Sequence, residues 1–245
     1  MFHFIGTTLL FRPLYNTLVL LLNISPMADA GVAIILLTLL IKFILSPFTR
    51  KAIKSQLEMR KLEPEINKLK EKYADNKQEL NKKTFELYKI HKVNPFAGCL
   101  PLLIQIPILG TLYWVFTKGL DMNQVSSLYS FVHMPAHINI HFLGFIDLTA
   151  KKNLLFSILV AGAQYMQFAM LTPKPAPGVA GESMQDQMMK NMQSQMKYFL
   201  PVMIFLLAYF QVPVAVSLYW IVNNIYAVIQ QKTLQKKYAN VAVIQ

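Results

Sequence analysis

The sequence has 245 residues, of which 54% are hydrophobic, and a formal net charge of +12. Several near-continuous apolar stretches in a chain of this length exclude an ordinary soluble domain and indicate a polytopic membrane protein. The positive charge is concentrated between these stretches, as in the cytoplasmic segments of membrane proteins, so it does not by itself indicate nucleic-acid binding. The single cysteine, Cys99, excludes a disulfide within one chain. The first residues show no signal-peptide pattern.

Residues 1–28 are predicted to form an N-terminal interfacial amphipathic segment. Apolar residues within 9–24 recur at helical spacing, whereas Arg12, Pro13 and Asn16 interrupt the stretch. This pattern favours a helix that lies in the membrane interface, with Arg12 and Asn16 on the surface away from its apolar face. A true span here would add a sixth crossing and place the N-terminus inside, so five crossings are preferred.

Residues 29–49 are predicted to be the first transmembrane helix. Lys42 lies in its cytoplasmic half, and Thr38 lies one turn earlier on the same face. An ammonium group in hydrocarbon costs about 2.5–3.5 kcal/mol on insertion scales, so it needs water, a partner or a substrate beside it. Lys42 either reaches the lipid interface or belongs to a polar, water-accessible site. Its separation from Arg50 favours the polar site.

Residues 50–94 are rich in Lys and Arg and are predicted to form a cytoplasmic helical hairpin. Sparse apolar stripes at helical spacing flank Asp75 and Asn76, a turn and helix-start signal. Pro64 should kink or interrupt the first arm. The alternative is a solvated linker, which the paired stripes disfavour. The basic surface is typical of segments that bind anionic lipid or ribosomal RNA through phosphate groups, without sequence specificity.

Residues 95–118 are predicted to be the second span, and residues 119–152 a loop on the opposite side. The span contains Gln105 and two prolines, which membrane helices tolerate when neighbours bond the freed carbonyl groups. The loop has no cation between its flanking lysines, which fits an extracytoplasmic location. Three of its histidines are four residues apart, namely His133, His137 and His141. They would share one face of a helix and could bind metal, but Pro135 argues against a regular helix, so no metal is predicted.

Residues 153–171 are predicted to be the third span, with Gln164 and Gln167 inside it. Residues 172–197 are predicted to be a cytoplasmic loop rich in methionine. Four of its methionines recur at a spacing of four residues, namely Met184, Met188, Met192 and Met196. They either pack on neighbouring helices or lipid, or offer an adaptable apolar surface to varied partners.

Residues 198–211 and 214–231 are predicted to be the fourth and fifth spans, separated by a turn signal at 211–213. Each would have about 15–17 residues and a length near 24 Å, shorter than a hydrocarbon core of roughly 30 Å. Such helices predict packing without tilt, cytoplasmic extension or a locally thinned bilayer. Residues 232–245 are the predicted cytoplasmic tail. Five spans with the N-terminus outside place the hairpin, the Met-rich loop and the tail inside, with most of the 24 Lys and Arg residues.

The predicted spans contain one cation and no acid. Their polar residues are Thr38, Lys42, Gln105, Gln164 or Gln167, Tyr219 and Asn223. The chain has no Gly-rich phosphate loop, no paired intramembrane carboxylates and no cluster of His and Cys. A proton or cation transporter normally needs a buried carboxylate, so that class is disfavoured. One positive charge among neutral hydrogen-bonding groups suits transient contact with an acidic or polar peptide segment, or an anion pathway.

Five stretches, in this order, resemble the YidC-type membrane protein insertases, a family with mitochondrial and chloroplast members. The stretches are TLLIKFILSPFTRKA (38–52), MRKLEPEINKLKEKY (59–73), LYKIHKVNPFAGCLPLLIQIPI (87–108), FIDLTAKKN (145–153) and SLYWIVNNIYAVIQQ (217–231). The resemblance covers residues 10–231. Its NPFAGCLPLLIQIPI part, with two prolines and a glutamine, is particularly specific.

The resemblance implies an all-α membrane protein with five transmembrane helices around a hydrophilic groove, an N-terminal interfacial helix and a cytoplasmic helical hairpin. It implies a chaperone-like insertase that receives clients from the cytoplasmic side and releases their apolar segments into the bilayer, with no nucleotide, cofactor or enzymatic reaction. The implied partners are nascent membrane proteins and anionic lipids, with the ribosome and the Sec translocon as candidates. No specific nucleic acid is implied. The implied location is the cytoplasmic membrane of a bacterium.

The resemblance, together with the polar residues of the spans and the basic charge of the hairpin, predicts a client-contacting groove and a recruitment surface on the hairpin. The groove residues are Lys42, Thr38, Gln105, Gln164, Gln167, Tyr219, Trp220 and Asn223. The hairpin residues are Arg60, Lys61, Lys68 and Lys72. The family's groove cation is usually an arginine, so Lys42 keeps the charge but loses the planar donor fork that binds a carboxylate through two hydrogen bonds. The glutamine of the third span aligns less cleanly, so Gln164 and Gln167 both remain candidates.

Two other classes of protein remain. A small anion channel or transporter would use Lys42 as its selectivity charge and would often contain inverted repeats, of which the sequence shows none. The third class is a structural subunit of a larger membrane complex.

Overall fold

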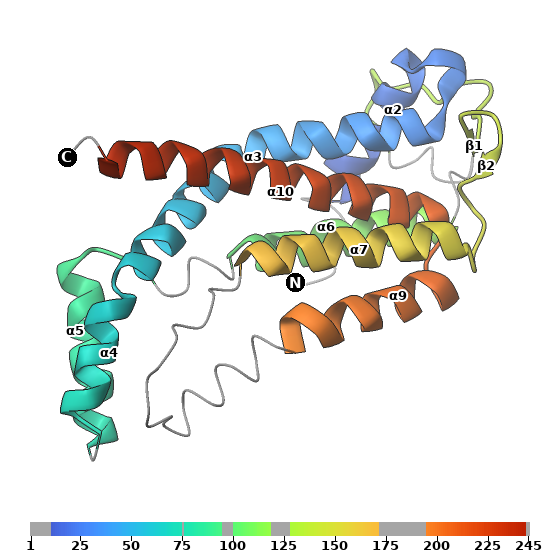
Figure 1. The fold of residues 1–245 in the computed structure, drawn as a ribbon. Coiled ribbons are helices and arrows are strands. Elements are labelled where there is room, and N and C mark those ends of the chain that lie inside the picture. Colours follow the sequence, from blue (N-terminus) through green and yellow to red (C-terminus); the bar gives the residue numbers. More distant parts are fainter. Residues whose placement is uncertain (1–10, 75, 95–99, 119–127, 172–194, 244–245) are drawn as a thin grey trace.

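The structure, a computed structural model, describes residues 11–74, 76–94, 100–118, 128–171 and 195–243. Most of the predicted Met-rich loop, and Cys99, lie outside these described residues. The described part is mostly helical, as predicted. Its long helices run side by side in one bundle (Figure 1). They are α3 (Ala30–Lys61), α6 (Leu100–Lys118), α7 (Leu154–Leu171), α9 (Leu200–Phe210) and α10 (Val214–Val243).

Of the described helices, α3 is the one that is long and apolar enough to cross a membrane. Shorter apolar helical segments cover Ile104–Phe116, Leu154–Met170 and Gln195–Phe210. Length and composition thus support the first predicted span directly, and the total of five spans stays a prediction.

Helix α3 begins at a strong cap. The Asp29 carboxylate accepts hydrogen bonds from the backbone N–H groups of Gly31, at 2.7 Å, and Val32, at 3.1 Å, which satisfies two donors that no helical carbonyl can reach. The helix does not end with the predicted span at residue 49. It continues through Pro47 to Lys61, into the segment that was predicted to be the hairpin.

Helix α2 (Arg12–Ile24) packs against α3 and supplies fully buried side chains to the core, among them Tyr15 and Leu18. A short 3₁₀ turn, η2 (Pro26–Ala28), joins the two helices. The helix itself was predicted, but the placement of Asn16 on its surface is wrong. Asn16 is 1% exposed and its Oδ1 accepts a 2.7 Å hydrogen bond from the Tyr129 N–H. The loop segment that contains Tyr129 covers this side of α2, so Asn16 is buried beneath it.

Helix α10 lies between α3 and α7, and α9 packs on α7 (Figure 1). A π-helical turn, η5 (Gln195–Phe199), precedes α9, and the predicted turn at 211–213 separates α9 from α10. Helix α10 has 30 residues and continues past residue 231, where the predicted fifth span ends, so it has the extension that the sequence allowed for a short span. It continues because residues 232–243 contain neither Pro nor Gly and hold good helix formers.

Two helices outside the bundle, α4 (Glu63–Lys72) and α5 (Lys77–Ile90), form the predicted hairpin (Figure 1). As expected, Pro64 lies in the first turn of α4, directly after the break at Leu62, where its missing N–H costs nothing. Asn76 caps α5 by accepting the Glu79 N–H at 3.1 Å.

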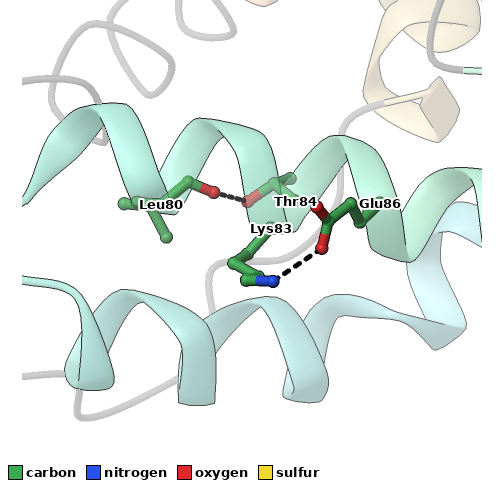
Figure 2. A network of polar contacts seen from close by, with 4 residues as sticks. All are labelled: Leu80, Lys83, Thr84 and Glu86. Atoms are coloured by element: carbon green, nitrogen blue, oxygen red, sulfur yellow. Dashed lines mark hydrogen bonds and ion pairs between the residues drawn. The ribbon is translucent and has the colours of Figure 1, made fainter.

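Helix α5 carries a local polar network (Figure 2). Lys83 Nζ donates to Glu86 Oε2 at 2.8 Å, and the Thr84 hydroxyl donates to the Leu80 carbonyl at 2.8 Å. The Lys83–Glu86 hydrogen bond raises the pKa of Lys83 and lowers the pKa of Glu86, so both groups stay charged near neutral pH. A solvent-exposed pair of this kind contributes little to stability.

At the opposite end of the bundle, β1 (His141–Phe142) pairs with β2 (Ile146–Asp147) in an antiparallel ribbon. The ribbon is tied to the start of α3, because the Leu143 N–H donates to Asp29 Oδ2 at 3.1 Å and Phe142 packs on Gly31. His133, His137 and His141 are exposed, and the described segment that holds them is not helical. They therefore do not share a helix face.

Candidate functional site

Helix α10 contains buried polar residues that face its neighbours. Tyr219, Asn223 and Asn224 are each at most 4% exposed. Polar groups inside an apolar bundle are costly unless they are hydrogen-bonded, so their partners define the site.

Tyr219 connects α10 to α6. Gln105 Nε2 lies 2.7 Å from the Tyr219 hydroxyl oxygen. Gln105 is half-buried, so the hydrogen bond is partly shielded from solvent. Two predicted site residues, distant in the sequence, are thus in direct contact.

Gln164 connects α10 to α7. Its Oε1 accepts hydrogen bonds from Trp220 Nε1 at 3.1 Å and from Asn224 Nδ2 at 2.8 Å. Gln164 is 6% exposed. Gln167 is half-buried and makes no hydrogen bond with the described residues. Of the two candidate glutamines in α7, Gln164 is therefore the one that joins the polar residues of α10.

The contacts continue along α10. Asn223 Nδ2 donates to Asn224 Oδ1 at 3.2 Å. Trp220, Gln164, Asn224 and Asn223 thus form a single chain of hydrogen bonds, called here the amide relay. Asn224 belongs to the relay but was not among the predicted site residues. Its position directly after Asn223 in an apolar helix was the signal that could have identified it.

Thr38 and Lys42 lie on α3, and no direct contact joins them to the amide relay. Thr38 is 1% exposed and its hydroxyl donates to the Ile34 carbonyl of its own helix at 2.7 Å. Lys42 is partly exposed and makes no hydrogen bond or ion pair with the described residues. Its neighbours Phe43 and Ile44 are 76% and 60% exposed, which suits contact with lipid.

A second polar contact lies between α3 and α10, further toward the hairpin. The Thr49 hydroxyl lies 3.1 Å from Gln230 Oε1, and Gln230 Nε2 lies 3.3 Å from Ser46 Oγ. Sequence reasoning missed these three residues. The available signal was their spacing, because Ser46 and Thr49 follow Lys42 by one and two turns on the same face.

Arg60, a predicted hairpin residue, contacts the bundle. Its guanidinium donates to the Met170 carbonyl at the end of α7, at 2.8 Å. Cations are favoured at this end of a helix because the last carbonyl groups have no helical partner. Partial burial lowers the pKa of Arg60, while nearby Glu63 opposes the shift.

The other three hairpin cations are exposed. Lys61 pairs with Glu58 at 3.1 Å, and Lys72 lies over the Tyr73 ring. Lys68 is exposed on α4. These side chains are accessible to a partner, whereas Arg60 is engaged.

Comparison with known proteins identifies the family. A family model described as 60Kd inner membrane protein matches residues 22–241. The chain is similar to a protein named membrane protein insertase YidC from Fusobacterium nucleatum, with 36% identity over 230 residues that cover 93% of this chain and 98% of the relative.

Two longer relatives carry the same name. The protein from Oleidesulfovibrio alaskensis is 34% identical over 94% of this chain and 39% of the relative. The protein from Francisella philomiragia is 35% identical over 87% of this chain and 34% of the relative. The chain therefore corresponds to little more than a third of these two relatives. The family match over most of the chain confirms the resemblance seen in the sequence: this chain belongs to the 60Kd inner membrane protein family.

Proposed function

We propose that this protein is a membrane protein insertase. It receives client polypeptides from the cytoplasmic side in a hydrophilic groove between its helices and releases their apolar segments into the bilayer. The observation that carries this proposal is the set of polar residues that α10 holds against α6 and α7 inside an apolar bundle. The names of the relatives support it.

The groove is formed by the predicted site residues of α3, α6, α7 and α10. They are Thr38, Lys42, Gln105, Gln164, Tyr219, Trp220 and Asn223, with Gln167 beside them and Asn224 as an addition. The ammonium of Lys42, with no acidic partner in the described part of the chain, attracts the acidic or polar extracytoplasmic segment of a client. Such a site lowers the cost of moving polar groups into the membrane.

The proposed orientation places the N-terminus outside and the C-terminus inside, in a bacterial cytoplasmic membrane. The hairpin, the Met-rich loop and the end of α10 then lie in the cytoplasm, where cations are enriched. The exposed Lys61, Lys68 and Lys72 of the hairpin recruit anionic lipid, the ribosome or the Sec translocon. Arg60 holds the base of the hairpin against α7 instead.

Site-specific photocrosslinking tests the proposal. A photoreactive residue replaces Trp220, and nascent membrane proteins of increasing length are presented on stalled ribosomes. We expect adducts at particular chain lengths, which disappear when the apolar segment of the client is deleted. A probe at Leu20, an exposed position on α2, is the matched control. Absence of adducts from positions 220 and 105, at normal protein levels, would contradict the insertase function. The names of the relatives give no support to the alternative of an anion channel.

A further inference from the structure

The amide relay has a fixed direction, because its first member can only donate. The indole N–H of Trp220 has no acceptor lone pair, so Gln164 must present its oxygen to it. The same oxygen faces Asn224, which must therefore present its Nδ2 group. The oxygen and nitrogen of a side-chain amide can usually be exchanged with little change in shape, so their assignment rests on the hydrogen-bond network. Here the single donor, Trp220, determines the orientation of every amide that follows.

The direction of the relay leaves one atom without a partner. Because Nδ2 of Asn224 faces Gln164, its Oδ1 faces Asn223, and Asn223 must present its own Nδ2 there. Asn223 Oδ1 then points away from the relay. It is buried, in a residue that is 4% exposed, and no described residue donates a hydrogen bond to it. Buried polar atoms of this kind are rare and call for a specific explanation.

The unpartnered acceptor lies at the same level of the bundle as Lys42. Helices α3 and α10 run in the same direction (Figure 1), and the Thr49–Gln230 hydrogen bond aligns them. Lys42 precedes Thr49 by two helical turns, and Asn223 precedes Gln230 by two turns, about 10 Å along the axis in each helix. Among the described residues, a cationic donor and a neutral acceptor that both have no hydrogen-bond partner therefore lie at one depth of the bundle.

We propose that Asn223 Oδ1 accepts a backbone N–H group of the client polypeptide, at the level where Lys42 attracts client carbonyl or carboxylate oxygens. This inference rests on the proposed insertase function and specifies its chemistry. A peptide group presents one N–H donor and one C=O acceptor whatever its side chain. An acceptor beside a cation is therefore complementary to any polar segment, which suits a site that handles different sequences.

The test removes the N–H donors from the client rather than its charge. Two clients are compared in proteoliposomes that contain the full-length protein. Their translocated segments are identical except that alanines in one are replaced by prolines in the other, because proline keeps the carbonyl and lacks the N–H. Insertion is measured as the fraction of the segment that is protected from added protease.

The wild-type protein is expected to insert the alanine client about three- to tenfold more than the proline client, the range that one neutral hydrogen bond provides. Asn223→Leu is expected to abolish this preference. Trp220→Phe leaves Asn223 in place but removes the donor that orients the relay, so it should weaken the preference. Ser217→Ala, which removes a buried hydroxyl from α10 at another level, should keep it.

Three outcomes overturn the inference. If Asn223→Leu keeps the wild-type preference, Asn223 Oδ1 is satisfied by water or by the protein. If it lowers insertion of both clients and leaves their ratio unchanged, Asn223 is structural. If the wild-type protein inserts neither client, the proposed function itself fails and this inference fails with it.

Discussion

Gln105 on α6 and Tyr219 on α10 form a 2.7 Å hydrogen bond between two helices that are far apart in the sequence. Tyr219 is 1% exposed, so its hydroxyl has little access to bulk water. Tyr219→Phe should lower the free energy of unfolding by about 1 kcal/mol, because it removes a hydrogen bond and leaves Gln105 Nε2 without this partner. Thermal unfolding in detergent measures the loss.

The pairing also predicts how two substitutions combine. Because the two side chains bond to each other, Gln105→Leu and Tyr219→Phe together should cost less than the sum of the single variants. The control is Tyr226→Phe, at a half-buried position two turns after Tyr219 on α10. It should combine additively with Gln105→Leu. Additivity in both pairs would argue against a Gln105–Tyr219 contact.

The charge of Lys42 should matter more than its shape. Lys42→Ala is expected to reduce insertion of clients with acidic extracytoplasmic segments, and Lys42→Arg to preserve it, because both Lys and Arg attract a carboxylate electrostatically. Clients with neutral segments serve as the control and should be less affected. The measurement is protease protection in proteoliposomes. Equal insertion of the acidic client by all three proteins would refute the role of this charge.

Arg60 should hold the hairpin base against α7. Arg60→Ala removes the donor to the Met170 carbonyl and is expected to cost about 1–2 kcal/mol, since charged donors make stronger hydrogen bonds than neutral ones. Hydrogen exchange should accelerate at the end of α7 and at the junction of α3 and α4. Lys61→Ala, next in the chain and at an exposed position that pairs with Glu58 on its own helix, should leave exchange at α7 unchanged. The same acceleration in both variants would rule out a specific role for Arg60.

Asp147 should make the β1–β2 ribbon sensitive to acid. The hydroxyl of Thr149, followed by its backbone N–H, donates to the carboxylate and lowers the pKa of Asp147 below its ordinary value. A carboxyl group whose pKa is lowered by folding stabilises the folded state fully above the ordinary pKa, near 3.9. That stabilisation is lost as the pH falls through the lowered pKa.

The titration of Asp147 can be followed by NMR in the solubilised protein. Thr149→Val removes the side-chain donor, so it should move the titration midpoint of Asp147 up toward the ordinary value. Thr111→Val, which removes an exposed hydroxyl bonded within α6, should not. An unchanged midpoint in Thr149→Val would show that the hydroxyl is not the cause.

Local sequence determined the helices and several of their ends, because these depend on neighbouring residues, although α3 and α10 run past the predicted ends of their spans. Pro64 marked the break before α4, Asn76 the cap of α5, and residues 211–213 the turn before α10. The length of its apolar run identified α3 as a span, and five short stretches of sequence were enough to identify the family. Lys42 was visible as a cation in an apolar run, since its cost depends on composition alone.

Tertiary structure decided which residues from distant parts of the chain contact each other. Which of Gln164 and Gln167 bonds to α10 depended on how α7 packs against it. The burial of Asn16 depended on a loop more than a hundred residues away, and the engagement of Arg60 depended on the end of α7. Hydrogen bonds require two groups within about 3 Å, so residue identity shows which groups can bond and the packing of the helices decides which ones do.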